Sequence, residues 1–150
     1  IPSREQRELA DWLMRQGVDL VIGSHPHVVQ PMELRRGKEG VPDRLVVYSL
    51  GNFISNMSRE HTDGGVMVKV VLGRKGLRRY IASAQYSLIY SSRYKNEQGK
   101  EDIRVVPAAS WSGKNQNSSF SVDSALIKYV NNTRLLLKGN NKEVEEYIFE

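Results

Sequence analysis

The 150-residue chain has no cysteine, only three histidines and no long hydrophobic run. The absence of cysteine excludes disulfides and thiolate ligands, so any metal site must use nitrogen and oxygen donors. A transmembrane helix needs about 18 or more consecutive apolar residues, so the sequence predicts no membrane span. It also lacks a helix-turn-helix, zinc-finger or stacked-aromatic pattern, and we therefore expect no binding to nucleic acid.

The overall composition is that of an ordinary globular domain. Hydrophobic residues make up 39% of the chain and charged residues 26%, and a chain of this length can build one core. The formal net charge is +5, partly because of two basic clusters at residues 35–38 and 74–79. The basic side chains of these clusters are either solvated on turns or form a surface that weakly attracts a polyanion, and the sequence leaves both interpretations open.

Two histidines follow a short apolar segment near the N-terminus. Residues 20–22 read as a buried strand, and Gly23 ends it before Ser24 and the sequence His25-Pro26-His27. Pro26 fixes its own backbone and restricts the residue before it, so the loop is stiff. A stiff loop with two imidazoles at the C-terminal end of a strand is typical of a transition-metal site.

A second predicted strand ends in a similar way. Residues 44–50 are apolar on both faces, which predicts a central strand, and Gly51 and Asn52 follow it. Two strand ends that each deliver a glycine and polar residues suggest one shared edge of a sheet. The alternative for the histidine pair is a chance occurrence on a surface loop. The third histidine, His61, lies in a polar stretch and reads as a solvated loop residue.

Residues 23–31 and 47–54 together resemble the bacterial capsule-synthesis CapA/PgsA family of poly-γ-glutamate biosynthesis, a branch of the calcineurin-like metallophosphoesterase superfamily. The resemblance implies that the chain is the C-terminal part of an α/β domain with a metallophosphatase-like α/β/β/α sandwich, a mixed or antiparallel sheet and flanking helices. It also implies that His25 and His27 are metal ligands. Ser24 and Asn52 would contact substrate or orient the ligands.

The same resemblance implies a metal-dependent hydrolase or transferase. The intact protein would hold two divalent ions (Mn, Zn or Fe), with the other ligands supplied by the missing N-terminal half of the domain. Two histidines do not complete such a site, so we expect this stretch alone to be inactive. The alternative is a non-catalytic envelope scaffold or assembly subunit of polymer synthesis and export, because a fold does not prove a chemistry.

The resemblance also bears on partners and location. It places the protein at the cell envelope, with a phosphoester or a polyanionic polymer as its substrate. A sandwich without its other half exposes an edge or a face of the sheet, so we expect contact with the missing half or self-association.

The chain reads as a single domain over residues 1–150. Its predicted parts are the sheet with the histidine loop (1–109), a polar loop (110–121) and C-terminal helices (122–150). The first helix is predicted to start at Ser3, which forms a capping box with Gln6, and to end at Gly17. Strands are expected at 18–22, 32–36, 44–50, 66–72, 77–90 and 103–106. A long helix is expected after Asp123, followed by a final helical piece at 142–149.

Overall fold

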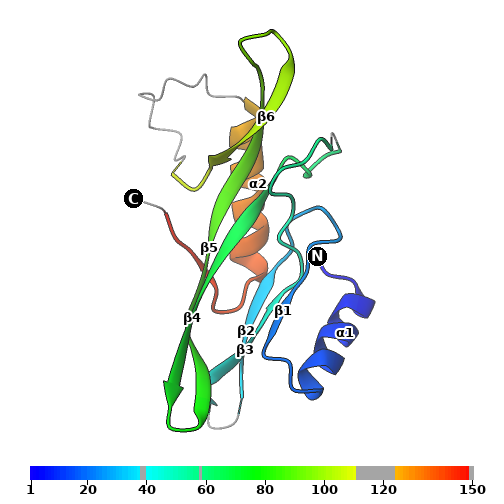
Figure 1. Cartoon of the computed structure of the whole chain (residues 1–150). Helices are drawn as coiled ribbons and strands as arrows, with labels where there is room; N and C mark the ends of the chain where they lie inside the picture. Colours follow the sequence, from blue (N-terminus) through cyan, green and yellow to red (C-terminus); the bar gives the residue numbers. More distant parts are fainter. Residues whose placement is uncertain (38–39, 58, 111–123, 149–150) are drawn as a thin grey trace.

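The computed structural model describes residues 1–37, 40–57, 59–110 and 124–148. The predicted mixed α/β class is confirmed (Figure 1). The elements are, in chain order, α1 (Arg4–Arg15), β1 (Leu20–Ile22), β2 (Met32–Arg36), β3 (Pro42–Val47), β4 (Gly64–Lys75), β5 (Arg78–Lys95), β6 (Glu101–Pro107), α2 (Ser124–Asn140) and β7 (Glu145–Glu146).

The first sheet has the strand order β1-β3-β2. The central strand β3 pairs in parallel with β1 and antiparallel with β2. Leu45, Val46 and Val47 of β3 are fully buried, as expected for a strand that is apolar on both faces. The prediction of a central strand is therefore confirmed.

Helix α1 covers one face of this sheet. Its N-terminus carries the predicted capping box: the Gln6 amide donates to the Ser3 hydroxyl, and the Ser3 amide donates to the Gln6 side chain. These bonds satisfy amides that an α-helix leaves without intrahelical partners. Ala10 and Met14 pack against Val46 and Tyr48 of the sheet and its continuation, whereas Leu9 and Trp12 of the same helix remain exposed.

The second sheet is built on the long β4–β5 hairpin. β4 and β6 flank β5 in antiparallel pairing, and β7 pairs with β5 in parallel. The segment after β3 joins the two sheets, because Leu50 accepts a hydrogen bond from Val66 and Asn52 donates one to Gly64. The chain around Asn52 is thus held to the start of β4.

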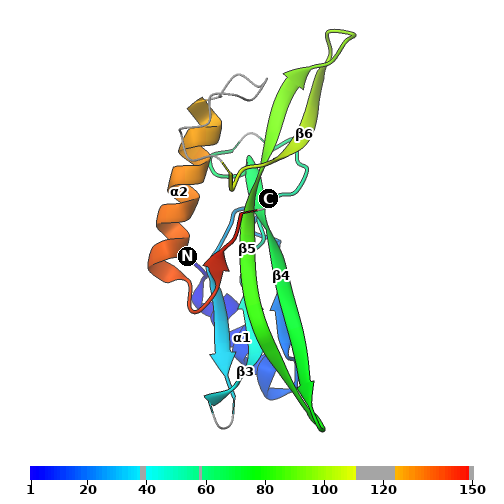
Figure 2. The ribbon, with the colours of Figure 1, turned by 90° about the vertical axis from the view of Figure 1, so that its left-hand side faces the viewer.

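The two sheets share one hydrophobic core with α2. Met32 and Leu45 of the first sheet, Leu88 of β5, and Val130 and Leu137 of α2 belong to the same buried cluster. α1 and the β4–β5 hairpin lie on opposite faces of the first sheet (Figure 1). α2 runs beside β5 (Figure 2) and contacts it directly. The layers are therefore those of an α/β sandwich.

A tyrosine cluster joins α2 to the hairpin. The rings of Tyr90 and Tyr129 are 5.6 Å apart, and the Tyr129 hydroxyl donates to the Gly65 carbonyl at 2.8 Å. Burial raises the pKa of Tyr129, so its hydroxyl stays protonated as the donor. This bond fixes the helix next to the start of β4.

The predicted helical piece at 142–149 is wrong. The described part of this segment contains β7, a strand that pairs with Gln85 and Tyr86 of β5. The Lys142 amide donates to the Met32 carbonyl, and the Lys142 carbonyl accepts from the Leu34 amide. Because these backbone groups are hydrogen-bonded to β2, they are not available for the hydrogen bonds of a helix. The predicted cap Asp123 and almost all of the polar loop 110–121 lie outside the described residues.

A buried carboxylate connects three parts of the chain. Only 8% of the Glu33 side chain is exposed, and its oxygens lie 3.8 Å from Arg7 of α1, 3.0 Å from Arg35 of β2 and 3.4 Å from Lys142. Arg35 also reaches Asp11 of α1 at 2.5 Å. The cluster ties α1 and the segment after α2 to the edge strand β2.

We expect Glu33→Gln to lower the free energy of unfolding by about 2 kcal/mol, since hydrogen bonds to charged groups contribute about that much. The matched control is Glu8→Gln, which removes the exposed ion pair of Glu8 with Arg4 and should cost less than about 0.5 kcal/mol. Urea denaturation measures both values. Equal losses in the two variants would show that the cluster does not stabilise the fold.

In the part of the chain that the structure describes, neither helix has the length and apolar character needed to cross a bilayer.

Candidate metal centre

The histidine loop starts where β1 ends. The Gly23 amide donates to the Val47 carbonyl, and the Gly23 carbonyl accepts from Leu50, so this glycine is bonded to β3 and to the chain that follows it. The loop then turns tightly, with the His27 amide donating to the Ser24 carbonyl at 3.1 Å. The predicted position of both histidines at the end of a strand is confirmed, but the prediction that this strand is buried is wrong, because Leu20 and Ile22 are exposed.

His27 has an unusual backbone conformation. Its φ angle is +59°, a left-handed region that residues other than glycine rarely adopt. His61 and Glu143 share this conformation, so the φ angle by itself does not mark a functional site. Here the backbone turn directs the imidazole toward the segment after β3.

The His27 ring is held by Asn52. The His27 Nδ1 atom lies 2.9 Å from the Asn52 Oδ1 atom, and Asn52 itself is buried. The Asn52 amide nitrogen donates to the Thr62 carbonyl at 2.8 Å, which fixes which end of the amide faces the ring. Because the amide oxygen can only accept, Nδ1 carries the proton and the lone pair lies on Nε2.

This arrangement is the one that metal-ligating histidines use. The ring nitrogen opposite the metal donates to an oxygen of the protein, which sets the tautomer and the orientation of the ring. His27 is exposed, so its Nε2 lone pair faces a region open to an incoming ligand.

His25 lies next to His27 on the same loop. The two ring centres are 6.1 Å apart and the ring planes are tilted by 48°. Two imidazoles on one zinc ion, with Zn–N distances of about 2.1 Å, would hold their ring centres roughly 5–6 Å apart. The observed spacing therefore suits a shared ion after a small adjustment, or two neighbouring ions.

The other candidate residues have distinct positions. Ser24 is exposed on the loop, and both ends of the Asn52 amide are hydrogen-bonded, to the His27 ring and to the Thr62 carbonyl. His61 is exposed and lies 3.8 Å from Glu60, as expected for a solvated residue. Sequence reasoning missed Thr62, because a backbone carbonyl carries no signal in the residue type.

The described residues contain no cluster of three or more His, Cys, Asp or Glu side chains that could hold a metal ion. The site on this chain thus offers two nitrogen donors. A structural zinc site requires four protein ligands and a catalytic one three, so the donor set fits a metal centre in chemistry and is incomplete in number.

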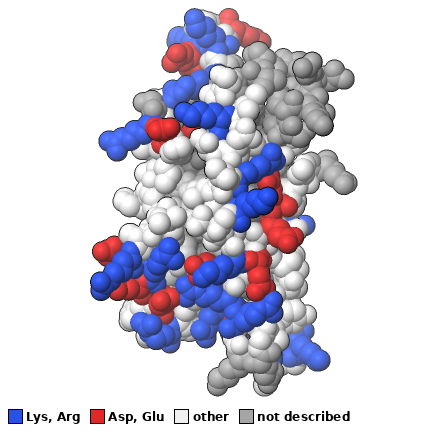
Figure 3. Space-filling view, turned by 180° about the vertical axis from the view of Figure 1, so that it is seen from behind, with Lys and Arg blue, Asp and Glu red and all other residues white. Residues whose placement is uncertain are grey.

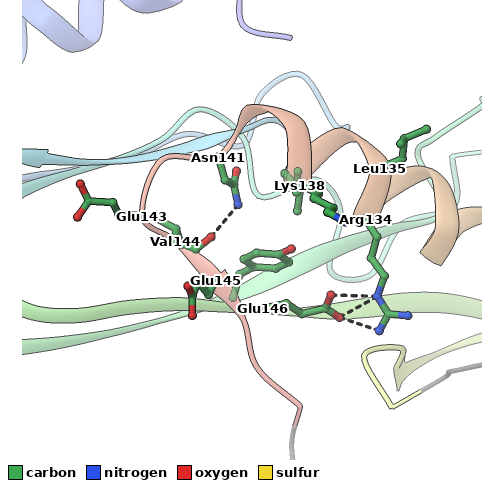
Figure 4. A pocket seen from close by; sticks show the side chains of 10 residues that line it. Arg134, Leu135, Lys138, Asn141, Glu143, Val144, Glu145 and Glu146 are labelled. Atoms are coloured by element: carbon green, nitrogen blue, oxygen red, sulfur yellow. Dashed lines mark hydrogen bonds and ion pairs between the residues drawn. The ribbon is translucent and has the colours of Figure 1, made fainter.

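Neither His25 nor His27 lines two of the larger cavities, although His61 and Val28 line one of them. One of about 660 Å³ lies between α2 and β7 (Figure 4). There the Arg134 guanidinium donates hydrogen bonds to both carboxylate oxygens of Glu146 and to the Ala109 carbonyl. Burial and the charge of Glu146 raise the pKa of Tyr86, on the floor of this cavity, to about 12. The other, of about 670 Å³, is lined by Val28, Val29 and residues of α2.

Comparison with known proteins finds a family model that matches the N-terminal part of this chain. Residues 1–57, which include His25, His27 and Asn52, match the family described as "Bacterial capsule synthesis protein PGA_cap". The "PGA biosynthesis protein CapA" of Bacillus subtilis (strain 168) is 33% identical over 79 residues. Over this stretch the chain is similar to the CapA proteins.

The relationship to CapA covers part of each protein. The alignment with the Bacillus subtilis CapA spans 53% of this chain and 19% of that relative. The "Capsule biosynthesis protein CapA" of Bacillus anthracis is 33% identical over 75 residues, which are 50% of this chain and 17% of the relative. The chain thus matches about a fifth of the length of these CapA proteins. No solved structure matches the chain.

Proposed function

We propose that His25 and His27 are two ligands of a divalent metal centre in a CapA-like protein of capsule or poly-γ-glutamate biosynthesis. The observation that carries this proposal is the hydrogen-bonded chain from His27 through Asn52 to the Thr62 carbonyl. It holds the ring in the tautomer that leaves Nε2 free. A purely solvated surface histidine needs no buried asparagine to set its tautomer.

The proposed reaction class is metal-dependent hydrolysis or transfer at a phosphoester, by a metallophosphoesterase-related mechanism. When bound, a divalent ion (Mn, Zn or Fe) would polarise a phosphoryl oxygen and lower the pKa of a coordinated water. His27 and His25 would hold it through ring nitrogens, with Asn52 orienting His27. The Ser24 hydroxyl, exposed on the same loop, would donate a hydrogen bond to a substrate oxygen.

The remaining ligands would approach at the open side of β1. This strand is at one edge of the first sheet, and its residues Leu20 and Ile22 remain 37% and 50% exposed. Unpaired strand edges with apolar side chains readily accept a further segment. We therefore propose that ligands from elsewhere in the intact protein reach the histidines from this side.

A non-catalytic scaffold at the cell envelope is the second candidate. It is favoured by the absence of a third metal-binding side chain among the described residues. Under that alternative the histidine loop would serve packing or assembly, and neither ring would respond to a metal ion. Metal binding therefore separates the two functions.

Long-range ¹H–¹⁵N correlation spectra of the histidine rings test the proposal. We expect His27 in the Nδ1–H tautomer, and we expect Zn²⁺ titration to shift the Nε2 signals of His27 and His25. His61 is the internal control and should stay unchanged. An Nε2–H tautomer for His27, or a response of His61 equal to that of the pair, would favour the scaffold.

A further inference from the structure

The β4–β5 hairpin carries charge of one sign only. Between Asp63 and Glu97 the sequence has no Asp or Glu, and its basic residues are Lys69, Arg74, Lys75, Arg78, Arg79, Arg93 and Lys95. Four of these lie on either side of the turn between the two strands. The hairpin ends in a tip that extends to one end of the molecule (Figures 1 and 2).

The tip also exposes large apolar side chains. Leu77, at the turn, is 94% exposed, and Leu72 is 66% exposed. The turn is well defined: Gly76 has a φ of +62°, and the Arg74 guanidinium donates to the Gly76 carbonyl at 2.7 Å. An ordered turn thus presents a leucine to solvent between pairs of basic residues.

Further basic side chains lie on the neighbouring strands β2 and β3. Arg36 ends β2 and Arg44 lies within β3, and the lower part of the face seen in Figure 3 carries many basic side chains with acidic ones among them. Acidic groups are also present near the tip, and one of them, Asp19, is exposed. Glu143 pairs with Arg36, while Asp19 and Asp43 line a hollow of about 520 Å³ beside the leucines.

We propose that the β4–β5 tip docks on the surface of an anionic lipid bilayer. Arg74, Lys75, Arg78 and Arg79 would lie among the headgroups, where basic residues are attracted by anionic lipids, and Leu77 would enter the boundary with the acyl chains. A soluble polyanion would pair with the cations but would leave the leucines in water. The exposed leucines therefore favour the bilayer, and the proposal is independent of the metal centre.

Co-sedimentation of the full chain with vesicles tests this proposal. We expect binding to vesicles of phosphatidylcholine with phosphatidylglycerol, little binding to phosphatidylcholine alone, and a loss of binding as salt rises. The double variant Lys75→Gln/Arg79→Gln should bind about 25-fold more weakly, since each basic residue contributes about fivefold. Leu77→Ser should bind about tenfold more weakly.

The matched control lies at the opposite end of β5. Lys95→Gln/Lys100→Gln removes two exposed charges from the β5–β6 turn, where Glu97 and Glu101 are neighbours, and should bind vesicles like the parent chain. Circular dichroism melting checks that every variant folds. Leu77→Ser should leave Zn²⁺ binding at the histidines unchanged.

Two results would overturn the proposal. One is equal binding to neutral and anionic vesicles. The other is unchanged vesicle binding by Leu77→Ser together with full release by soluble polyglutamate, which would make the tip a polyanion-binding surface that needs no bilayer.

Discussion

Alanine at His27 is expected to abolish the stoichiometric uptake of Zn²⁺ or Mn²⁺ by this chain, and alanine at His25 is expected to do the same. Each change removes one of two nitrogen donors on a stiff loop, and a single imidazole does not hold a divalent ion. Isothermal titration with metal analysis of the recovered protein measures the loss. His61→Ala is the control, because His61 lies beside Glu60 on an exposed loop.

Asn52→Leu should weaken metal binding by this chain without abolishing it. The leucine keeps the volume of the side chain but removes the acceptor for His27 and the donor for the Thr62 carbonyl. Loss of a partner that orients a metal-bound histidine typically weakens metal affinity by about 10–100-fold. Uptake that is unchanged in Asn52→Leu and lost in His27→Ala would mean that the ring needs no orientation by Asn52.

Local patterns predicted the elements that depend on neighbours in the sequence. The capping box of Ser3 and Gln6 is complete within one helical turn, and the burial of β3 on both faces follows from its own residues. The histidine loop was also predicted, because Gly23 and Pro26 determine the turn locally. The role of the two rings as ligands stays a prediction.

Long-range pairing explains what the sequence did not reveal. The segment after α2 forms a strand because it meets β2 and β5, and Asn141 accepts a hydrogen bond from Met32 across 109 positions of sequence. The role of Asn52 likewise depends on Thr62, ten positions away, through a backbone carbonyl. Neither interaction leaves a periodic pattern that a reading of residue types can detect.

Gly23→Ala is expected to destabilise the fold by about 3 kcal/mol, in the upper part of the range for overpacked sites. A Cβ atom at Gly23 would lie 2.3 Å from the Tyr48 carbonyl oxygen and 3.3 Å from the Val47 oxygen. Both are backbone atoms of the chain that β1 packs against, so the clash cannot be relieved by a side-chain rotation. The histidine loop must move away from β3 instead.

Gly139→Ala is the matched control for this change. No atom lies within 4 Å of a Cβ built there, and alanine in a helix is favoured over glycine by about 1 kcal/mol. Thermal and urea denaturation should thus show a lower free energy of unfolding for Gly23→Ala and a higher one for Gly139→Ala. The Gly23 carbonyl also accepts a hydrogen bond from Leu50, two residues before Asn52. Displacement of the histidine loop in Gly23→Ala should therefore separate the His27 ring from Asn52. A Gly23→Ala protein that keeps both full stability and the Nδ1–H tautomer of His27 would show that the loop does not depend on this close contact.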